Sequence, residues 1–263
     1  MSPGAFQQLL TEQGHSLYRP MPWRDDTRPY YVLVSELMLQ QTQAPRVIPK
    51  FNAFIAAFPD EQALAAASLA EVLVMWQGLG YNRRAKFLHD AAQHIVRRGS
   101  FPREQQALLA LPGVGRNTAG AVRAYAFNQP ALFVETNIRT VYLHHFFDDS
   151  DAVDDRQILA MLEQTIDHEQ PRSFYWALMD YGTFLKRQGV GTIRRSKHYK
   201  KQSALKGSVR EIRGRIIAQL VHGGVTRTAL EQAVSYDERF DTALAGLERD
   251  GLIRVGDTIY LTK

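Results

Sequence analysis

The sequence predicts a mainly α-helical protein that ends in a small winged-helix-like domain. Apolar residues recur with helical spacing in one segment after another up to about residue 187, as at Leu33, Leu37 and Met38. No segment before residue 250 alternates apolar and polar residues cleanly, which disfavours a sheet. Beyond a basic stretch, three further helical patterns precede two short strand-like runs, which is the element order of a winged helix.

The helices of the body are predicted from this periodicity and from the prolines and glycines that end or interrupt it. They are expected over residues 1–14, 30–43, 47–58, 60–66, 69–76, 82–98, 103–109, 119–125, 136–147, 155–167 and 171–187. Residues 21–24 (MPWR) are expected to be extended or a turn, because the residue before a proline avoids the helical region.

The C-terminal part is expected to form three helices and a β-hairpin. Ser208 and Glu211 predict a capping box at the start of the first helix, and Thr226 or Thr228 caps the second. The helices are expected over residues 209–220, 226–234 and 237–251, and two strands over residues 253–261. A winged helix could bind DNA or protein or pack on the preceding domain, so this fold alone does not give a function.

Composition limits the class of protein. The 263 residues suffice for a large domain at residues 1–185 and a small one at residues 208–263, joined by a linker at residues 186–207. The net charge of +5 is compatible with a polyanionic partner. The sequence has no cysteine, which excludes disulfides, thiol catalysis and cysteine-ligated metal sites. It has no apolar run of 18 residues and no signal-peptide pattern, so a cytoplasmic, nucleoid-associated protein is expected.

The most informative stretch is residues 111–120, LPGVGRNTAG. Gly113 and Gly115 allow the backbone to turn tightly between two helices. The backbone N–H groups at the start of the second helix form an anion site, and in a basic protein a nucleic-acid phosphate is the expected anion. By itself, the same pattern is equally compatible with a simple tight turn.

The linker between the two predicted domains is strongly basic. It carries Arg194, Arg195 and Lys197, followed by further lysines, among few acidic residues. Such a run is typical either of contact with a DNA backbone or of a solvated tether, and the residues do not separate these two interpretations.

Two carboxylates are the candidate catalytic groups. Glu36 lies in an otherwise apolar helical stretch, and Glu135 directly follows the apolar residues 131–134. Either residue alone would more often be structural. Together, in desolvating surroundings beside a nucleic-acid-binding hairpin, they indicate an acid and an electrostatic stabiliser at one site. We expect no metal site, since the adjacent His144 and His145 cannot share a helix face.

At this point the sequence resembles the helix-hairpin-helix DNA glycosylase superfamily, and within it the MutY-type adenine DNA glycosylases. The resemblance covers roughly residues 5–185, with its motifs in family order. They are MPWR at residues 21–24, SELMLQQTQ at 35–43, WQGLGYNRRA at 76–85, LPGVGRNTAGAV at 111–122, VETN at 134–137 and MDYG at 179–182.

The resemblance implies a two-lobed helical body with the active site in the cleft between its lobes. By position, Glu36 matches the general acid that protonates the flipped adenine, and Arg24 matches a residue near that base. Gln41 and Tyr81 match residues that enter the DNA base stack. Glu135 and Asn137 match the catalytic aspartate and its hydrogen-bonding neighbour. The hairpin residues that match the DNA grip are Gly113, Val114, Gly115, Asn117 and Thr118.

These roles suit the cleavage of an N-glycosidic bond. The base must leave the duplex before the bond can be reached. Protonation of the base improves the leaving group, and a carboxylate beside the sugar stabilises the oxocarbenium-like cation. Burial of Glu36 among apolar residues would raise its pKa, as a general acid requires.

Four departures from the family carry information. Glu135 replaces an aspartate, which adds roughly 1.5 Å of reach. The cysteines of an iron–sulfur cluster after MDYG are missing, and the basic linker stands in their place. Asn117 occupies the position of the Schiff-base lysine of bifunctional relatives, so no efficient strand cleavage is expected. The winged-helix-like segment replaces the domain that reads the oxidised guanine opposite adenine.

Three functions therefore remain open. The first is a monofunctional glycosylase for adenine in a mispair, acting as a monomer on double-stranded DNA. The second is a glycosylase for hypoxanthine, another damaged purine or a mismatched pyrimidine. The third is an inactive protein that binds lesions or DNA structures. No cofactor is expected, although the hairpin could hold a monovalent cation.

Overall fold

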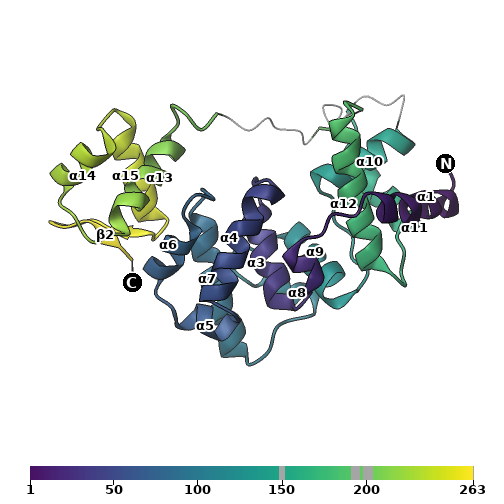
Figure 1. The fold of residues 1–263 in the computed structure, drawn as a ribbon, viewed down its shortest axis with the longest axis horizontal. Helices are drawn as coiled ribbons and strands as arrows, with labels where there is room; N and C mark the ends of the chain where they lie inside the picture. Colours follow the sequence, from purple (N-terminus) through teal and green to yellow (C-terminus); the bar gives the residue numbers. More distant parts are fainter. Residues whose placement is uncertain (148–151, 191–195, 198–203, 263) are drawn as a thin grey trace. The chain divides into compact units, whose positions relative to one another are not determined.

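The computed structural model describes residues 1–147, 152–190, 196–197 and 204–262, and it confirms the mainly α-helical fold (Figure 1). The helices of the body are α1 (Pro3–Ser16), α2 (Pro22–Asp25), α3 (Pro29–Leu39), α4 (Ala44–Ala57), α5 (Glu61–Ala66), α6 (Leu69–Trp76), α7 (Arg83–Arg98), α8 (Gln105–Leu109), α9 (Arg116–Phe127), α10 (Thr136–Phe146), α11 (Asp155–Thr165) and α12 (Pro171–Arg187). The C-terminal elements are α13 (Val209–Leu220), α14 (Arg227–Val234), α15 (Arg239–Arg249), β1 (Ile253–Arg254) and β2 (Tyr260–Leu261).

By their internal contacts, the described residues form two compact units. The first unit comprises Met1–Val32, Arg103–Ala110 and Val114–Lys201. The second comprises Leu33–Pro102, Leu111–Gly113 and Gln202–Lys263, so the C-terminal elements belong to it. The expected domains at residues 1–185 and 208–263 and the linker at residues 186–207 stay a prediction.

In the first unit, α12 is the central helix and packs against α1, α9 and α10 (Figure 1). Buried aromatic rings fill this core, and Phe133 stacks on Tyr175 with ring centroids 4.3 Å apart. Helices α10 and α12 approach closely at Gly182, where a Cβ would lie 2.4 Å from the carbonyl oxygen of Asn137. The absence of a side chain at Gly182 therefore sets how close the segment after Glu135 lies to α12.

In the second unit, α7 packs against α5 and α6. Its core includes the fully buried Trp76 and Phe54, whose rings meet edge to face with centroids 6.1 Å apart. Ser68 and Glu71 form a capping box at the start of α6. The left-handed Gly99 ends α7.

The C-terminal elements have the predicted order of three helices and a β-hairpin (Figure 1). Strands β1 and β2 are antiparallel, with Ile253 opposite Leu261. A further bridge joins Val225 to Ile259. Helices α13 and α15 pack together over Ile216, Leu244 and other buried apolar residues.

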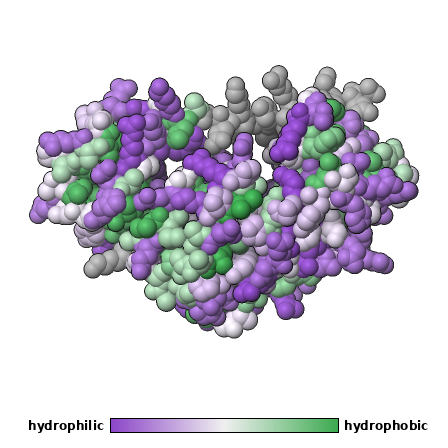
Figure 2. All heavy atoms as spheres, viewed as in Figure 1, coloured by the Kyte–Doolittle hydropathy of each residue, from purple (hydrophilic) through white to green (hydrophobic). Residues whose placement is uncertain are grey.

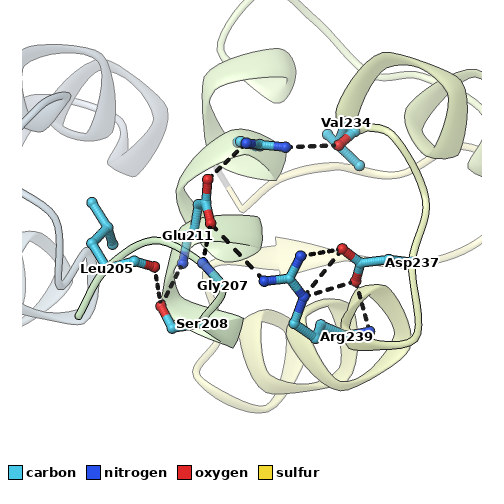
Figure 3. Close-up of polar contacts among 8 residues, drawn as sticks. Leu205, Gly207, Ser208, Glu211, Val234, Asp237 and Arg239 are labelled. Atoms are coloured by element: carbon cyan, nitrogen blue, oxygen red, sulfur yellow. Dashed lines mark hydrogen bonds and ion pairs between the residues drawn. The ribbon is translucent and has the colours of Figure 1, made fainter. Parts of the chain in front are cut away.

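The start of α13 departs in part from the predicted capping box (Figure 3). Ser208 caps the helix by accepting the N–H of Glu211, as expected. The Glu211 carboxylate, however, accepts the N–H of Gly207 at 2.8 Å and pairs with Arg215 at 2.7 Å. The carboxylate thus satisfies the N–H one residue before the cap.

Two other local predictions are wrong. Residues 21–24 are largely helical, because Pro22 occupies the first turn of α2, where a proline has no hydrogen bond to lose. Helix α3 ends at Leu39, short of residue 43, and Gln41 then takes a left-handed conformation with φ 56°. Elsewhere the observed and expected helix ends differ by three residues or fewer. The second helix of the hairpin, α9, begins at Arg116, three residues before its expected start, and its cap is Gly115.

Hydrophilic residues cover much of the face shown in Figure 2, with patches of hydrophobic residues between them. Among the described residues, no helix combines the length and apolar character needed to cross a membrane. Helix α7 is typical, because Arg97 and Arg98 in its last turn are exposed while Leu88 and Ile95 are buried.

Candidate functional site

Glu135 lies at the junction between a buried extended segment and α10. Phe133 and Val134, just before it, are almost fully buried. Glu135 is the N-cap residue of α10 by its backbone, but its side chain makes no capping hydrogen bond. The carboxylate is therefore not engaged as a cap. Burial raises the pKa of the Glu135 carboxyl above its ordinary value, and the nearby Arg139 opposes this rise.

The segment that carries Glu135 is tied to the glycine hairpin. The side-chain amide of Asn117, in the first turn of α9, donates a hydrogen bond to the carbonyl oxygen of Val134 at 2.8 Å. Arg139 donates to the same oxygen at 3.4 Å and holds Asp155 at 2.6 and 2.7 Å. The hairpin helix and the candidate carboxylate thus form one connected piece of the first unit.

Asn137 follows in the first turn of α10. Its amide nitrogen lies 3.9 Å from the sulfur of Met179. Its Oδ1 is buried and has no hydrogen-bond partner among the described residues. A buried acceptor without a partner is costly, so this atom suits a water molecule or a ligand.

The hairpin has the geometry that its glycines predict. Gly113 adopts φ 75°, and a Cβ there would lie 2.6 Å from Cβ of Phe87. Gly115 is the N-cap residue of α9. The side chains of Val114 and Thr118 are buried, so their predicted contribution to DNA binding would come from backbone N–H groups.

Arg116 is an exposed residue of the hairpin that sequence reasoning missed. It stands at the first position of α9, where a cation is unfavourable toward the positive end of the helix dipole. A cation in that place is favoured once an anion binds between it and the helix. That mismatch of charge and helix end was the available sequence signal.

Glu36 lies in the middle of α3 between buried neighbours. Ser35, Leu37 and Met38 are fully buried, whereas Glu36 is half-buried. Glu36 belongs to the second unit and Glu135 to the first. That the two carboxylates meet at one site stays a prediction.

Gln41 and Tyr81 share an unusual backbone conformation. Both have positive φ, 56° and 48°, which side chains other than glycine seldom adopt. Such residues cluster at functional sites, because the surrounding structure must hold them in a strained conformation. The two residues expected to enter the DNA base stack are thus two of the three described non-glycine residues with positive φ in the second unit, the third being Ser235.

Arg84 is the residue that holds them, and sequence reasoning missed it. Its side chain is buried, and burial lowers its pKa to about 10, so it stays charged at neutral pH. The guanidinium donates at 2.6–2.9 Å to the carbonyl oxygens of Leu37, Met38 and Gln40, and at 3.0–3.3 Å to those of Leu79 and Gly80. One planar group therefore joins the loop of Gln41 to the loop of Tyr81.

Arg24 lies in a buried ion pair. Its guanidinium donates to both carboxylate oxygens of Asp180, at 2.7 and 3.1 Å. Arg19 pairs with the same carboxylate at 2.6 Å. Arg24 also lies over the rings of Tyr18 and Trp176. It is 7% exposed, and its role at a base pocket stays a prediction.

Asp180 stands in the MDYG motif, and its pairing with Arg24 and Arg19 was not foreseen from the sequence. Its carboxylate is 2% exposed and has two arginine partners, so the pair anchors residues 19–24 to α12.

Of the predicted linker residues, Lys197 is described and exposed. Its backbone N–H donates to the carbonyl of Val153 at 3.1 Å, and Ser196 forms a bridge with Val153. Arg194 and Arg195 lie outside the described residues. The DNA-binding roles of these three residues stay predictions.

Within the described ranges, no three histidine, aspartate or glutamate side chains are grouped as a metal site. The family's iron–sulfur cluster needs cysteine thiolates, and the sequence contains none. The residues of this chain therefore do not fit that cluster.

Comparison with known proteins identifies the family of this chain. A family model described as "HhH-GPD superfamily base excision DNA repair protein" matches residues 34–166. The adenine DNA glycosylase of Mycobacterium tuberculosis is 34% identical over 264 residues, which cover 90% of this chain and 86% of the relative. That of Buchnera aphidicola is 32% identical, and the match covers 68% of this chain but 52% of the relative, so the chain spans about half of that protein.

Among solved structures, a thermostable thymine-DNA glycosylase is similar to this chain. The TM-score is 0.62 at 25% identity, over 68% of this chain and 85% of the other. This similarity extends the agreement from sequence motifs to the arrangement of the helices.

Proposed function

The chain belongs to the HhH-GPD superfamily of base excision DNA repair proteins, and from that premise we propose that it is a monofunctional DNA glycosylase. Its proposed substrate is adenine in a mispair within double-stranded DNA, the base named for its relatives. The reaction breaks the bond between the deoxyribose C1′ and the base nitrogen. Water adds to C1′, and the products are an abasic site and free adenine.

In this proposal, Glu36 delivers a proton to the flipped base as the bond breaks. Glu135, in its ionised form, stabilises the positive charge that develops on the sugar. Asn137 presents its buried Oδ1 to the attacking water or to a polar group of the nucleotide. The logic is that of glycoside hydrolysis by two carboxylates, applied to a nucleoside.

The observation that carries the proposal is the hydrogen bond from Asn117 to the carbonyl of Val134. It ties α9, the second helix of the hairpin that we expect to bind phosphate, to the residue directly before Glu135. Gripping the DNA backbone would then fix the carboxylate relative to the sugar. Such positioning supplies much of an enzyme's rate, and an error of about 1 Å can cost about 100-fold.

The residue type at position 117 supports a monofunctional reaction. Asn117 stands where bifunctional relatives carry a lysine, and its amide cannot form a Schiff base with the abasic sugar. We expect strand breaks only after alkali treatment, and no covalent enzyme–DNA product when borohydride is added during the reaction. A trapped product in good yield would show that another amine of the chain acts as a nucleophile.

A second candidate keeps the mechanism and changes the base. The similar solved structure is that of a thymine-DNA glycosylase, so a mismatched pyrimidine belongs among the tested substrates. By the resemblance, we expect the segment after residue 207 to stand in place of the family domain that reads the opposing base, which leaves the choice of mispair to experiment.

The decisive experiment is a panel of duplexes that each carry one lesion or mispair. Base release is measured under single-turnover conditions with an alkali step. Adenine opposite guanine or 8-oxoguanine, hypoxanthine opposite thymine, and thymine opposite guanine are the principal members. Release of adenine in preference to the others supports the proposal, and binding without release of any base contradicts it.

Two variants test the carboxylates in the same assay. Glu36→Gln and Glu135→Gln should each slow release by about 10²–10⁴-fold while binding persists. The matched control is Glu163→Gln, since Glu163 is exposed on α11 in the first unit. Normal turnover by either site variant would remove that carboxylate from the mechanism.

A further inference from the structure

The C-terminal elements contact the very residue that is expected to enter DNA. Within the second unit, the guanidinium of Arg210 donates a hydrogen bond to the phenol oxygen of Tyr81. The same guanidinium lies over the Tyr81 ring, 4.9 Å from its centroid. Arg210 is in the first turn of α13 and is half-buried. The contact therefore joins the start of the C-terminal elements to the loop before α7.

Two further contacts join the C-terminal elements to α7, next to the contact between Arg210 and Tyr81. Asp250, just after α15, is held by Arg213 at 2.6 Å and lies 3.9 Å from Arg83 at the start of α7. The side chain of Lys86 runs beside Gly251, within 3.3 Å of the position a Cβ would occupy there. Three contacts therefore join the C-terminal elements to this region, one at Tyr81 in the loop before α7 and two in the first turn of α7, at Arg83 and Lys86.

Two arginines from distant parts of the sequence contact the Tyr81 side chain. Arg84 is part of α7 itself and lies 5.4 Å from the centroid of the Tyr81 ring. Arg210 comes from a segment 129 residues further along. With φ fixed at 48° and two guanidinium groups near the ring, Tyr81 has lost much of the rotamer freedom of an exposed tyrosine.

We propose that the C-terminal domain acts through Arg210 to position Tyr81 for entry into the DNA base stack. The proposal rests on the proposed function, since Tyr81 is expected to enter the duplex only if the chain is a glycosylase. Arg210 is a positioning residue: it touches Tyr81 and not the reacting base. A ring that is already ordered pays less entropy when it enters the stack, so base flipping becomes faster.

The proposal differs from a general electrostatic role for the domain. A cation that only attracts phosphate changes the affinity for every duplex and leaves the rate from the bound complex unchanged. A residue that orders Tyr81 changes that rate, and its effect depends on the phenol that it contacts. These two signatures separate the possibilities.

The first measurement uses the full chain without DNA. 3-Fluorotyrosine is placed at position 81, and its ¹⁹F resonance is recorded for the wild-type protein and for Arg210→Ala. The control is Arg249→Ala, because Arg249 is an exposed arginine of the same domain, on α15. Arg210→Ala should shift or broaden the resonance and Arg249→Ala should not. This measurement does not depend on enzymatic activity.

The second measurement follows a 2-aminopurine placed beside the target base, whose fluorescence reports unstacking, together with single-turnover base release. Arg210→Ala should slow both on the order of tenfold from the bound complex, with a smaller change in dissociation constant. Arg210→Lys, which keeps the charge but not the planar stacking, should recover part of the rate. In a Tyr81→Phe background, which lacks the phenol oxygen, the effect of Arg210→Ala should shrink.

The outcomes are distinct from those of the proposed function. A wild-type protein that releases no base contradicts the proposed function, while the ¹⁹F and 2-aminopurine signals still test the role of Arg210. Equal unstacking and release by wild type and Arg210→Ala would overturn the inference. So would an effect confined to affinity, or one that is additive with Tyr81→Phe.

Discussion

The carboxyl group of Glu135 is subject to two opposing influences. Burial raises its pKa, and the charge of Arg139 lowers it, with burial the larger. Yet the proposed role needs the ionised form, because only a carboxylate stabilises a positive sugar. Arg139 is itself shared with Asp155, which limits how strongly it can favour the charge on Glu135. We infer that base release should rise with pH as Glu135 loses its proton, and should fall again at the pH where Glu36 loses the proton that it donates.

This pKa predicts how stability depends on pH. A carboxyl whose folded-state pKa lies above the ordinary 4.5 binds its proton more tightly in the folded than in the unfolded chain. Its stabilising contribution is fully present below pH 4.5 and is lost as the pH rises through the folded-state pKa. The free energy of unfolding of Glu135→Gln relative to wild type should therefore increase with pH above 4.5. Urea titrations at a series of pH values measure this difference, and a constant difference would contradict the assigned pKa direction.

Asn117 gives a second prediction at this scale. Asn117→Ala removes the hydrogen bond to the carbonyl of Val134, which should lower the free energy of unfolding by about 0.5–1.5 kcal/mol. Because the segment before Glu135 is then less well held, base release should slow by more, on the order of 10- to 100-fold. Single-turnover kinetics and urea unfolding measure the two effects. Asn52→Ala, at an exposed position of α4, should change neither; parallel losses of stability and rate in both variants would contradict the assigned role.

At the scale of elements, the close approach of α10 and α12 depends on Gly182. Its ideal Cβ would lie 2.4 Å from the carbonyl oxygen of Asn137 and 2.8 Å from the carbonyl carbon, both backbone atoms that cannot rotate away. Any side chain at this position must therefore force the two helices apart. The displaced helix would be α10, which begins directly after Glu135.

Gly182→Ala should thus destabilise the protein by about 1–3 kcal/mol. The matched control is Gly214→Ala in α13, where a Cβ would meet nothing within 4 Å. That variant should be neutral or stabilising by up to about 1 kcal/mol, since alanine favours the helix. Thermal and urea unfolding test the pair. Equal effects of the two substitutions would show that the packing of α10 on α12 is not limited by Gly182.

The loops of Gln41 and Tyr81 illustrate a different relation between elements. Each loop has a non-glycine residue with positive φ, and the loop of Tyr81 also contains Gly78 and Gly80 with positive φ. Arg84 compensates by satisfying the carbonyl groups that the end of α3 and residues 79–80 expose. A buried cation with several carbonyl partners thereby fixes two loops from different parts of the chain relative to each other.

At the scale of the whole molecule, the net charge of +5 predicts that DNA binding depends on salt. The logarithm of the affinity should fall linearly with the logarithm of the salt concentration. Lys197→Ala should lower the affinity for all duplexes alike and reduce the slope by about 1. The control is Arg97→Ala, because Arg97 is also an exposed cation but has no proposed contact with DNA. It lies in the last turn of α7, roughly 20 Å along the helix from Arg83. An unchanged slope for Lys197→Ala would assign the linker to the role of a tether.

The sequence by itself determined the local structure and the family. Apolar periodicity and capping residues predicted the helices of the body and the C-terminal hairpin, because these depend on residues a few positions apart. The glycines of residues 111–120 predicted the hairpin because a positive φ at Gly113 needs no distant partner. Glu36 and Glu135 could be singled out because apolar neighbours in the chain already indicate a desolvated acid.

Only the tertiary structure decided which distant groups act together. The bonds of Asn117 to Val134, of Arg84 to Leu37 and of Arg24 to Asp180 join residues 17, 47 and 156 positions apart. Their formation depends on how the helices pack, and no local pattern encodes it. The helical start of MPWR also escaped prediction, because proline tolerates both an extended segment and a first helical turn. The physical reason is that helix propensity depends on neighbouring residues in the chain. The buried hydrogen bonds that position site residues form only when distant segments pack together and exclude water.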